Sequence, residues 1–287
     1  MDHKSKSASI EAVASRFRAV AVDLDGTALR PDSTLSERNL AALKACADRG
    51  IAVVIVTGRS PRAAEKFRAL LQSTGPMVYY NGAAVVDAPS GKVLASTLVP
   101  TDVVAGCLEV ARRLGLHFQA FLSDDRLVCR TDTPERAAYQ VRTGLQGDIL
   151  DFDQLLSLSG ANAPSFIKCM FIAEPDKLDE AQLSVDSLFG TRVYRTRSTS
   201  TFLEVMNNGV NKGHALKVAL NLRGVEAEDC VAFGDMENDI SMLEAVGWGV
   251  AMANAEANVK HKADDVAFSN VEDGVAVYLE SLLALKR

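Results

Sequence analysis

The stretch Ala19-Val20-Ala21-Val22-Asp23-Leu24-Asp25-Gly26-Thr27 is the most informative segment of this chain. A short apolar run that ends at two acids, a glycine and a threonine is typical of a buried strand that delivers carboxylates to a sheet edge. Two carboxylates two residues apart repel each other unless a cation or a function holds them there. Alone, the segment also fits an acidic strand-to-loop turn with Gly26 at the bend. The choice between these interpretations depends on the rest of the chain.

Composition limits the classes of protein that the chain can belong to. Apolar residues make up 48% of its 287 residues, which is enough for a large core. The net charge is −6 and the isoelectric point about 5.3, so a nucleic-acid partner is not expected. The five cysteines form no Cys-x-x-Cys pair and lie mostly in apolar runs. This pattern favours free thiols in a reducing compartment and fits neither a zinc site nor a disulfide framework.

The N-terminal region carries no sign of membrane insertion or secretion. Residues 1–16 hold two lysines and several serines but no apolar segment of the kind that a secretory signal requires. No window elsewhere reaches the length of a membrane-spanning helix. The sequence therefore predicts a flexible N-terminal extension over 1–16, no membrane association and a cytoplasmic protein.

Short apolar runs alternate with amphipathic stretches over residues 17–83, and this rhythm returns over 209–287. In the first part, strands are expected at 19–22, 51–56 and 77–80, with helices between them. The order βαβαβ is typical of a doubly wound layout. We therefore predict an α/β fold whose core is a doubly wound, Rossmann-like parallel sheet made by these two parts of the chain.

Residues 84–208 follow a different pattern. Short strands cluster there in hairpin-like neighbours, with fewer helices, which is typical of an α+β domain inserted into the core. Segment 144–164 is rich in Gly, Ser, Asn and Asp, and its pattern assigns no element to it. Three arginines at 192, 195 and 197 are expected on the solvated face of an outer strand. His117 and Trp248 are expected in structural roles.

Acidic residues, or a threonine and a glycine, follow three of the expected core strands. Parallel strands bring their carboxyl ends to one crevice, so these residues should meet although they lie far apart in sequence. Together they provide a carboxylate nucleophile, ligands for a hard cation, donors to phosphate oxygens and a fixed positive charge, as phosphoryl transfer requires. The residues are Asp23 and Asp25, Thr57 and Gly58, and Asp235, with Lys212 at a helix start and Asn238 and Asp239 just beyond Asp235.

Each of these pieces has a plain structural alternative. Thr57-Gly58-Arg59 also fits a strand-to-helix turn, and Lys212 alone fits a solvated surface lysine. Gly234-Asp235-Met236-Glu237-Asn238-Asp239 also fits an acidic helix N-terminus. All segments together, each at the functional end of its element, favour the catalytic interpretation.

These segments resemble the motifs of the haloacid dehalogenase superfamily of phosphohydrolases, in its Cof-type branch with a type IIB cap. Asp23–Thr27 is similar to the first motif, Thr57–Arg59 to the second, Asn211–Gly213 to the third and Gly234–Asp239 to the fourth. Asn81-Gly82-Ala83 also matches, at the point where members of this branch leave the core for the cap. The resemblance runs from residue 17 to the end, and most of the insert matches in layout only.

The resemblance implies a role for each motif residue. Asp23 would be the nucleophile and Asp25 the general acid and base. Magnesium would be held by Asp23, Asp235 and the backbone carbonyl of Asp25. Asp239 would orient Lys212 or metal-bound water. The implied groups that bind phosphate or substrate are the backbone of Leu24, then Thr57, Gly58, Arg59, Lys212 and Asn238.

The sequence thus predicts a magnesium-dependent phosphatase acting through an aspartyl phosphate on a small phosphorylated metabolite, with a preference for a sugar phosphate. A phosphomutase resembling phosphomannomutase shares the cap type and the nucleophile and is the alternative within this chemistry. A phosphoacceptor switch of the response-regulator type is disfavoured by Asp25, because a stable switch gains nothing from a residue that speeds hydrolysis. A silent binding module is disfavoured by the full set of motif residues. The sequence predicts neither the particular substrate nor the oligomeric state.

Overall fold

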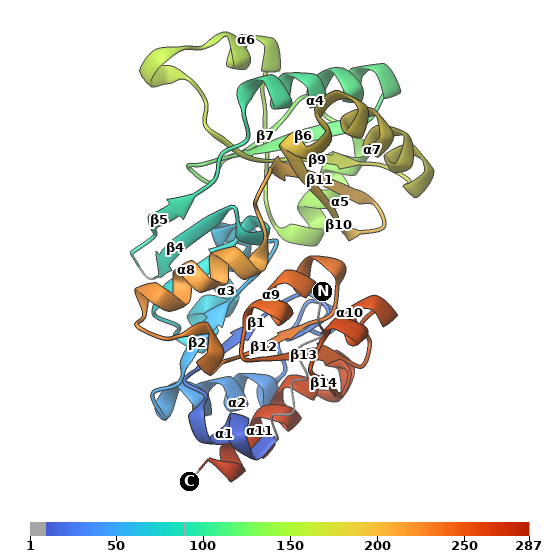
Figure 1. The fold of residues 1–287 in the computed structure, drawn as a ribbon. Coiled ribbons are helices and arrows are strands. Elements are labelled where there is room, and N and C mark those ends of the chain that lie inside the picture. The colour runs from blue at the N-terminus through green and yellow to red at the C-terminus, as the bar shows by residue number, and fades with distance from the viewer. Residues whose placement is uncertain (1–9, 89, 287) are drawn as a thin grey trace. The chain divides into compact units, whose positions relative to one another are not determined.

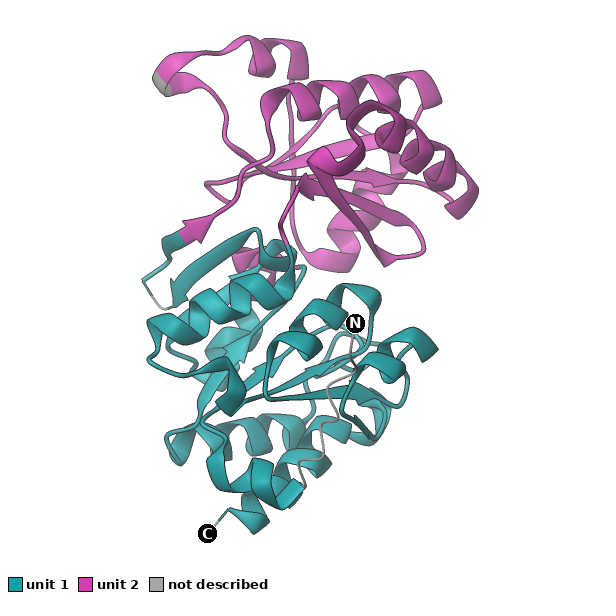
Figure 2. Ribbon diagram, in the orientation of Figure 1, with its two compact units in different colours: residues 1–58, 65–94, 211–287 teal, residues 59–64, 95–210 magenta. Residues whose placement is uncertain are grey.

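The computed structural model describes residues 10–88 and 90–286, which belong to two compact units (Figures 1 and 2). Unit 1 comprises Met1–Gly58, Glu65–Leu94 and Asn211–Arg287, and unit 2 comprises Arg59–Ala64 and Ala95–Val210. The sequence places the insert at 84–208, whereas this division begins its long segment at Ala95. The difference arises because β4 (Ala84–Ala88) pairs along its length with β3 (Gly75–Tyr79) and stays with the core.

Unit 1 is built on a five-stranded parallel sheet in the order β14-β13-β12-β1-β2. All four residues of β1 are buried, as expected for a strand covered on both faces. A parallel bridge between Val56 and Val78 connects β2 to the β3–β4–β5 sheet. Besides β3 and β4, the strands of these two sheets are β1 (Ala19–Val22), β2 (Ala52–Ile55), β5 (Lys92–Ser96), β12 (Cys230–Gly234), β13 (Trp248–Met252) and β14 (Asp265–Ala267).

Helices cover both faces of this sheet, which confirms the predicted α/β fold with a doubly wound core. Helices α1, α2 and α11 pack together, while α8 packs against α9 and β3 (Figure 1). Two β–α–β crossovers that leave the middle of the sheet in opposite directions place their helices on opposite faces. The helices are α1 (Ile10–Arg16), α2 (Glu37–Asp48), α3 (Pro61–Leu71), α8 (Lys212–Leu222), α9 (Ile240–Ala245), α10 (Ala257–Lys262) and α11 (Gly274–Leu285).

Helix α1 corrects the prediction of a flexible extension over 1–16. Residues 10–16 are helical and pack on α11, with Val13 and Ala14 buried, while residues 1–9 lie outside the described part of the chain. The signal is the spacing of Ile10, Val13, Ala14 and Phe17, which places apolar side chains on one helical face.

Asn39 ties α2 to the loop after β1 and to the last helix. Its Nδ2 donates to Ala28 O at 3.0 Å, and its Oδ1 accepts from Ala276 N at 2.9 Å. The helix begins at Ser36, whose hydroxyl accepts from Asn39 N as an N-cap. Through these bonds, a fully buried amide fixes the loop that follows Asp23 and Asp25.

Unit 2 is an α+β domain, as the sequence predicts. Its six-stranded sheet has the order β10-β11-β9-β6-β7-β8 and is antiparallel except for the β7–β8 pair. Helices α4 and α7 pack on each other and on β9, over a core in which Phe118 meets Phe152 and Phe171 edge-on at 5.4 Å. Its elements are α4 (Thr101–Leu114), β6 (His117–Leu122), β7 (Leu127–Cys129), α5 (Pro134–Thr143), β8 (Asp148–Ile149), α6 (Phe152–Ser157), β9 (Phe166–Ile172), α7 (Pro175–Phe189), β10 (Val193–Thr199) and β11 (Phe202–Asn207).

Segment 144–164 contains β8 and α6, which sequence patterns do not reveal. β8 has two residues and exists through its pairing with β7. α6 is one short helix, capped by Asp151 and anchored by the buried Phe152. Elements this short carry no periodicity, so only tertiary pairing defines them.

The three arginines, Trp248 and His117 make structural contacts, as the sequence predicts. The three arginines belong to the outermost strand and the turn before it, and each pairs with an aspartate on α4 or α7: Arg192 with Asp102, Arg195 with Asp186 and Arg197 with Asp179. Trp248 is buried and donates its Nε1 hydrogen to Tyr278 Oη at 2.8 Å. His117 is buried and hydrogen-bonded to Thr133 and Gln119. Among the described residues, no helix combines the length and apolar character needed to cross a bilayer.

Lys168 on β9 and Glu204 on β11 form an ion pair of 3.0 Å in which each side chain is 3% exposed. Breaking a buried pair on one side leaves an uncompensated charge, which costs about 3–5 kcal/mol. Lys168→Met should therefore lower the free energy of unfolding of unit 2 by about that amount in urea titrations followed by circular dichroism. Lys168→Met with Glu204→Leu should recover most of the loss, and a double variant as unstable as the single one would contradict this account.

Candidate active site

Three neighbouring strands bring Asp23, Thr57 and Asp235 to the same edge of the unit 1 sheet. Asp23 follows β1, Asp235 follows β12, and Thr57 lies two residues beyond β2. The backbone continues the ladder past β1, since Asp23 N donates to Phe233 O at 3.1 Å. The strand-end arrangement expected from the sequence is thus present, because β12, β1 and β2 are adjacent and parallel.

Lys212 is the positive charge of the site. It is the first residue of α8, after an N-cap in which Asn211 Oδ1 accepts from His214 N at 2.7 Å. Its Nζ lies 2.6 Å from Asp23 Oδ1 and 2.6 Å from Asp239 Oδ1, with only 1% of the residue exposed. Burial alone lowers the pKa of such an ammonium, but attraction from both carboxylates raises the pKa of Lys212 above its ordinary value. The structure excludes the surface-lysine alternative.

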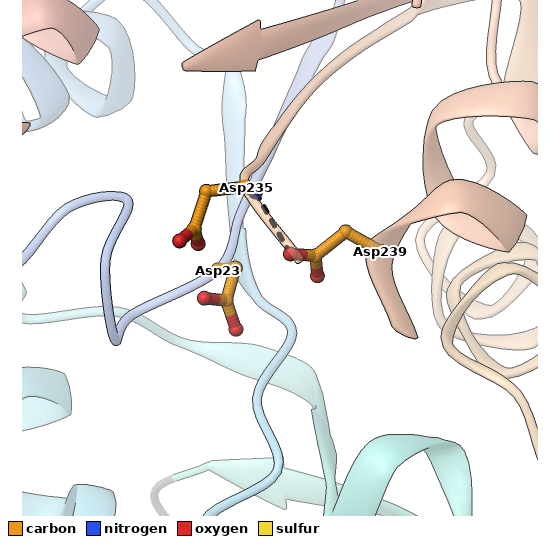
Figure 3. A group of neighbouring side chains, drawn as sticks. All are labelled: Asp23, Asp235 and Asp239. Carbon is orange, nitrogen blue, oxygen red and sulfur yellow. Dashed lines mark hydrogen bonds between the residues drawn. The ribbon is translucent and has the colours of Figure 1, made fainter. Parts of the chain in front are cut away.

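Asp239 has both carboxylate oxygens occupied. Its Oδ1 accepts from Lys212, and its Oδ2 accepts from the backbone N–H groups of Asp235 at 2.9 Å and Met236 at 3.0 Å. Gly234 makes this turn possible, because a Cβ at that position would lie 2.5 Å from Asp239 Cβ. Asp239 therefore holds Lys212 and fixes the turn that carries Asp235. Figure 3 shows its hydrogen bond to Asp235.

Asp235 is positioned by the first motif. Thr27 Oγ1 donates to Asp235 Oδ1 at 2.9 Å, and both residues are buried. Gly26 adopts φ +81°, and any Cβ there would collide with the Asp235 carboxylate, so glycine is required for two reasons. Burial, followed by repulsion from Asp239, raises the pKa of Asp235 to about 7. Burial also raises the pKa of Asp23, while the charge of Lys212 opposes that rise.

The carboxylates of Asp23, Asp235 and Asp239 fit the predicted magnesium site. Each offers an oxygen, these atoms all lie within 4.8 Å of one another, and all three residues are buried (Figure 3). Lys212 contributes one positive charge against three carboxylates, so a divalent cation would relieve the excess. Magnesium prefers oxygen ligands and is commonly held by one or two carboxylates. Because Asp239 is already occupied, Asp23 and Asp235 are the side chains that would hold it.

The other motif residues lie around this cluster. Leu24 is buried and its carbonyl accepts from Thr27 N and Leu29 N, which turns the chain sharply. Asp25 is exposed beside the buried Asp23. Thr57 is 1% exposed and donates its backbone N–H to Val78 O. Arg59 belongs to unit 2 and is not among the residues that unit 1 brings together.

Asn238 is hydrogen-bonded to Asn81, a residue to which the sequence analysis assigns no role in the site. Its Nδ2 donates to Asn81 Oδ1 at 2.9 Å, and both side chains are buried. The sequence marks Asn81-Gly82-Ala83 only as the exit from the core. Thr27 likewise has no assigned role before the structure places it on Asp235. Asn81 and Thr27 both lie in turns at strand ends, where such residues usually form hydrogen bonds to the nearby backbone. Their partners here lie more than 150 positions away in the sequence, so a local pattern does not identify them.

Comparisons with known proteins show the class of enzyme to which the chain belongs. Residues 20–279 match the family of haloacid dehalogenase-like hydrolases. A pyridoxal phosphate phosphatase of Escherichia coli K12 is 31% identical over 93% of this chain and 98% of its own. A 5-amino-6-(5-phospho-D-ribitylamino)uracil phosphatase of Bacillus subtilis 168 is 28% identical over 93% and 99%. A haloacid dehalogenase-like hydrolase structure from Bacteroides thetaiotaomicron matches with a TM-score of 0.82, at 27% identity over 93% and 99%.

The chain therefore belongs to the haloacid dehalogenase-like hydrolases and is a phosphatase of their Cof-type branch. The resemblance stated from the four motifs is confirmed. Relatives of similar identity are named for different substrates, so identity alone does not select one.

The raised pKa of Asp235 predicts how pH affects the metal-free protein. The folded state binds this proton up to about pH 7, whereas the usual aspartate value is 3.8, so the folded state holds more protons between these values. The free energy of unfolding should therefore fall as pH rises from about 4 to 7. Asp235→Asn should flatten this slope in thermal unfolding with a chelator present.

Magnesium should stabilise the wild-type protein above pH 7, because it binds the folded state, and should have little effect on Asp235→Asn. Glu237→Gln, at an exposed acid in the same turn, serves as the control and should keep both behaviours. An unchanged slope in Asp235→Asn, or equal magnesium stabilisation in both variants, would contradict the assignment.

Proposed function

We propose that this phosphatase is magnesium-dependent and hydrolyses a small phosphorylated metabolite through an aspartyl phosphate on Asp23. The observation that carries the proposal is the buried Lys212 ammonium 2.6 Å from Asp23 Oδ1, at the sheet edge where Asp235 follows the adjacent strand. This contact fixes the carboxylate in one orientation, and the charge of Lys212 favours its ionised form against the effect of burial, which raises the pKa of Asp23. A fixed, ionised carboxylate is what a nucleophile in phosphoryl transfer requires.

The first step transfers the phosphoryl group to the protein. An Asp23 carboxylate oxygen forms a bond to phosphorus while the bond from phosphorus to the ester oxygen breaks. Asp25 gives its proton to the departing oxygen, so the alcohol leaves neutral. When bound at Asp23 and Asp235, magnesium would offset the negative charge of the phosphate group. Lys212 offsets more, and the Thr57 hydroxyl, the Gly58 N–H and the Asn238 amide are proposed donors to phosphate oxygens.

The second step returns the protein to its starting state. Asp25, now ionised, takes a proton from water, and the water oxygen bonds to phosphorus as the bond to Asp23 breaks. Inorganic phosphate leaves and Asp25 is protonated again. The difference in exposure between the two acids suits this division of labour: Asp23 is 4% exposed and held in place, whereas Asp25 is exposed and can exchange protons with substrate and water.

We further propose a sugar phosphate as the preferred substrate class and place substrate selection in unit 2. The unit 1 residues described above bind the phosphate group, which every candidate substrate shares, so they cannot rank the alcohols. The test is a panel of sugar phosphates, pyridoxal 5′-phosphate and nucleotide monophosphates, assayed for phosphate release with magnesium and with a chelator. Isomerisation of a sugar phosphate without release of phosphate would instead favour the phosphomutase.

Substitutions of Asp23 and Asp25 should affect different steps of the reaction. Asp23→Asn should lower kcat at least 10³-fold on every substrate, because an amide is a poor nucleophile. Asp25→Asn should lower steady-state turnover by about 10²–10⁴-fold, yet p-nitrophenyl phosphate needs little acid assistance to depart. Rapid mixing of Asp25→Asn with that ester should therefore release a burst of about one nitrophenolate per protein. A burst from Asp23→Asn, or none from Asp25→Asn together with normal turnover, would contradict these roles.

A further inference from the structure

We propose that Asn81 is a positioning residue that holds the Asn238 amide in the orientation needed to bind the substrate's phosphate group. The inference rests on the proposed function, since it assigns Asn238 as a phosphate ligand. It concerns a residue outside the Asp23–Asp235–Lys212 cluster.

Asn81 connects two strand ends of the site. It lies in the 3-10 turn Tyr80–Gly82 that follows β3, and it is fully buried. Its backbone N–H donates to Thr57 O at 3.0 Å, and its Oδ1 accepts from Asn238 Nδ2 at 2.9 Å. One residue thereby fixes the distance between the second and fourth motifs.

The backbone at Asn81 is held in an uncommon conformation. Tyr80 has φ +52° and Asn81 has φ +57°, both in the left-handed region that residues other than glycine rarely adopt. Asparagine tolerates this region better than most residues. The turn is also fixed at Gly82, where a Cβ would collide with Asn211 O, next to Lys212. A strained turn packed between motif segments is a feature found at functional sites.

The Asn81 amide lies directly beside Gly58. Gly58 packs directly against it, because a Cβ at position 58 would lie 2.8 Å from Asn81 Oδ1. The absence of a side chain at Gly58 is thus what admits the amide into this space. Gly58 serves the second motif both through its own N–H and by making room for Asn81.

Asn81 determines which end of the Asn238 amide faces which way. An amide rotated by 180° would place Asn238 Oδ1 against Asn81 Oδ1, and two acceptors repel. In the observed orientation, Nδ2 uses one hydrogen on Asn81 and keeps a second for another acceptor. Asn238 Oδ1 is buried, with no hydrogen-bond partner among the described residues, and Asn238 is 9% exposed. Since leaving a buried acceptor unpaired is unfavourable, Asn238 on its own would have reason to rotate.

A double-mutant cycle tests this coupling. The variants are Asn81→Gly, which keeps the left-handed backbone accessible, Asn238→Ala, and both together. Asn81→Gly should raise KM for p-nitrophenyl phosphate and Ki for inorganic phosphate about 10-fold each, with kcat within about 3-fold. In the Asn238→Ala background, the same substitution should change both constants less than 2-fold, because its target is gone.

Tyr278→Phe is the control, since it removes a buried hydroxyl of the same unit that accepts from Trp248 Nε1 and donates to Asp265 Oδ2, neither of which is a motif residue. It should lower the melting temperature and leave KM and Ki within 2-fold. Additive effects of Asn81→Gly and Asn238→Ala would overturn the proposal, because a merely structural role of Asn81 would act equally in both backgrounds. A wild-type protein without phosphatase activity would instead contradict the proposed function.

A measurement on the wild-type protein covers the case in which Asn81→Gly does not fold. The Asn238 side-chain amide signals in ¹⁵N–¹H spectra are identified by their loss in Asn238→Ala. They should exchange slowly with solvent, and one of the two proton signals should shift when inorganic phosphate and magnesium are added. Rapid exchange, or no shift at saturating phosphate, would overturn the proposal.

Discussion

The contact of the Lys212 ammonium with Asp23 and Asp239 is the interaction on which the site depends. At 2.6 Å from each carboxylate and almost without solvent, the ammonium holds the proposed nucleophile on one side and the fourth motif on the other. Removing one partner of such a group leaves a buried charge uncompensated, which is far more costly than losing a surface pair. Asp239 contributes by holding Lys212 and the turn that carries Asp235, so one amino group and three carboxyl groups share a small buried volume.

The second constraint is steric. Glycines stand at three close approaches in the site: Gly26 against Asp235, Gly58 against Asn81 and, within the fourth motif, Gly234 against Asp239. A side chain at any of these positions would push apart groups that hydrogen bonds hold within about 3 Å. The motifs are therefore parts of one packed arrangement, and these glycines are explained by the side chains that lie directly beside them.

The sequence predicts the core parallel strands, their polar ends and the family, because apolar periodicity and strand-end chemistry are local signals. It does not predict α1 or α6, whose short apolar faces are defined by the elements they pack against. As a lysine, Lys212 would ordinarily be expected at the surface. Its buried position becomes evident only in the structure, where Asp23 and Asp239, which are distant in sequence, both contact it. Asn81 and Thr27 escape prediction for the same reason, since their roles consist of bonds to residues of the fourth motif. The catalytic roles, the magnesium site and the cytoplasmic location stay predictions.

The central claim is that Asp23 carries the phosphoryl group, and acid quenching during turnover tests it most directly. Wild-type protein mixed with a ³²P-labelled substrate and magnesium should retain label in an acid-stable, base-labile acyl phosphate. Reduction with borohydride followed by peptide mapping should place the modified aspartate at position 23. Label on any other residue, or turnover at full rate with no covalent label at any quench time, would contradict the account.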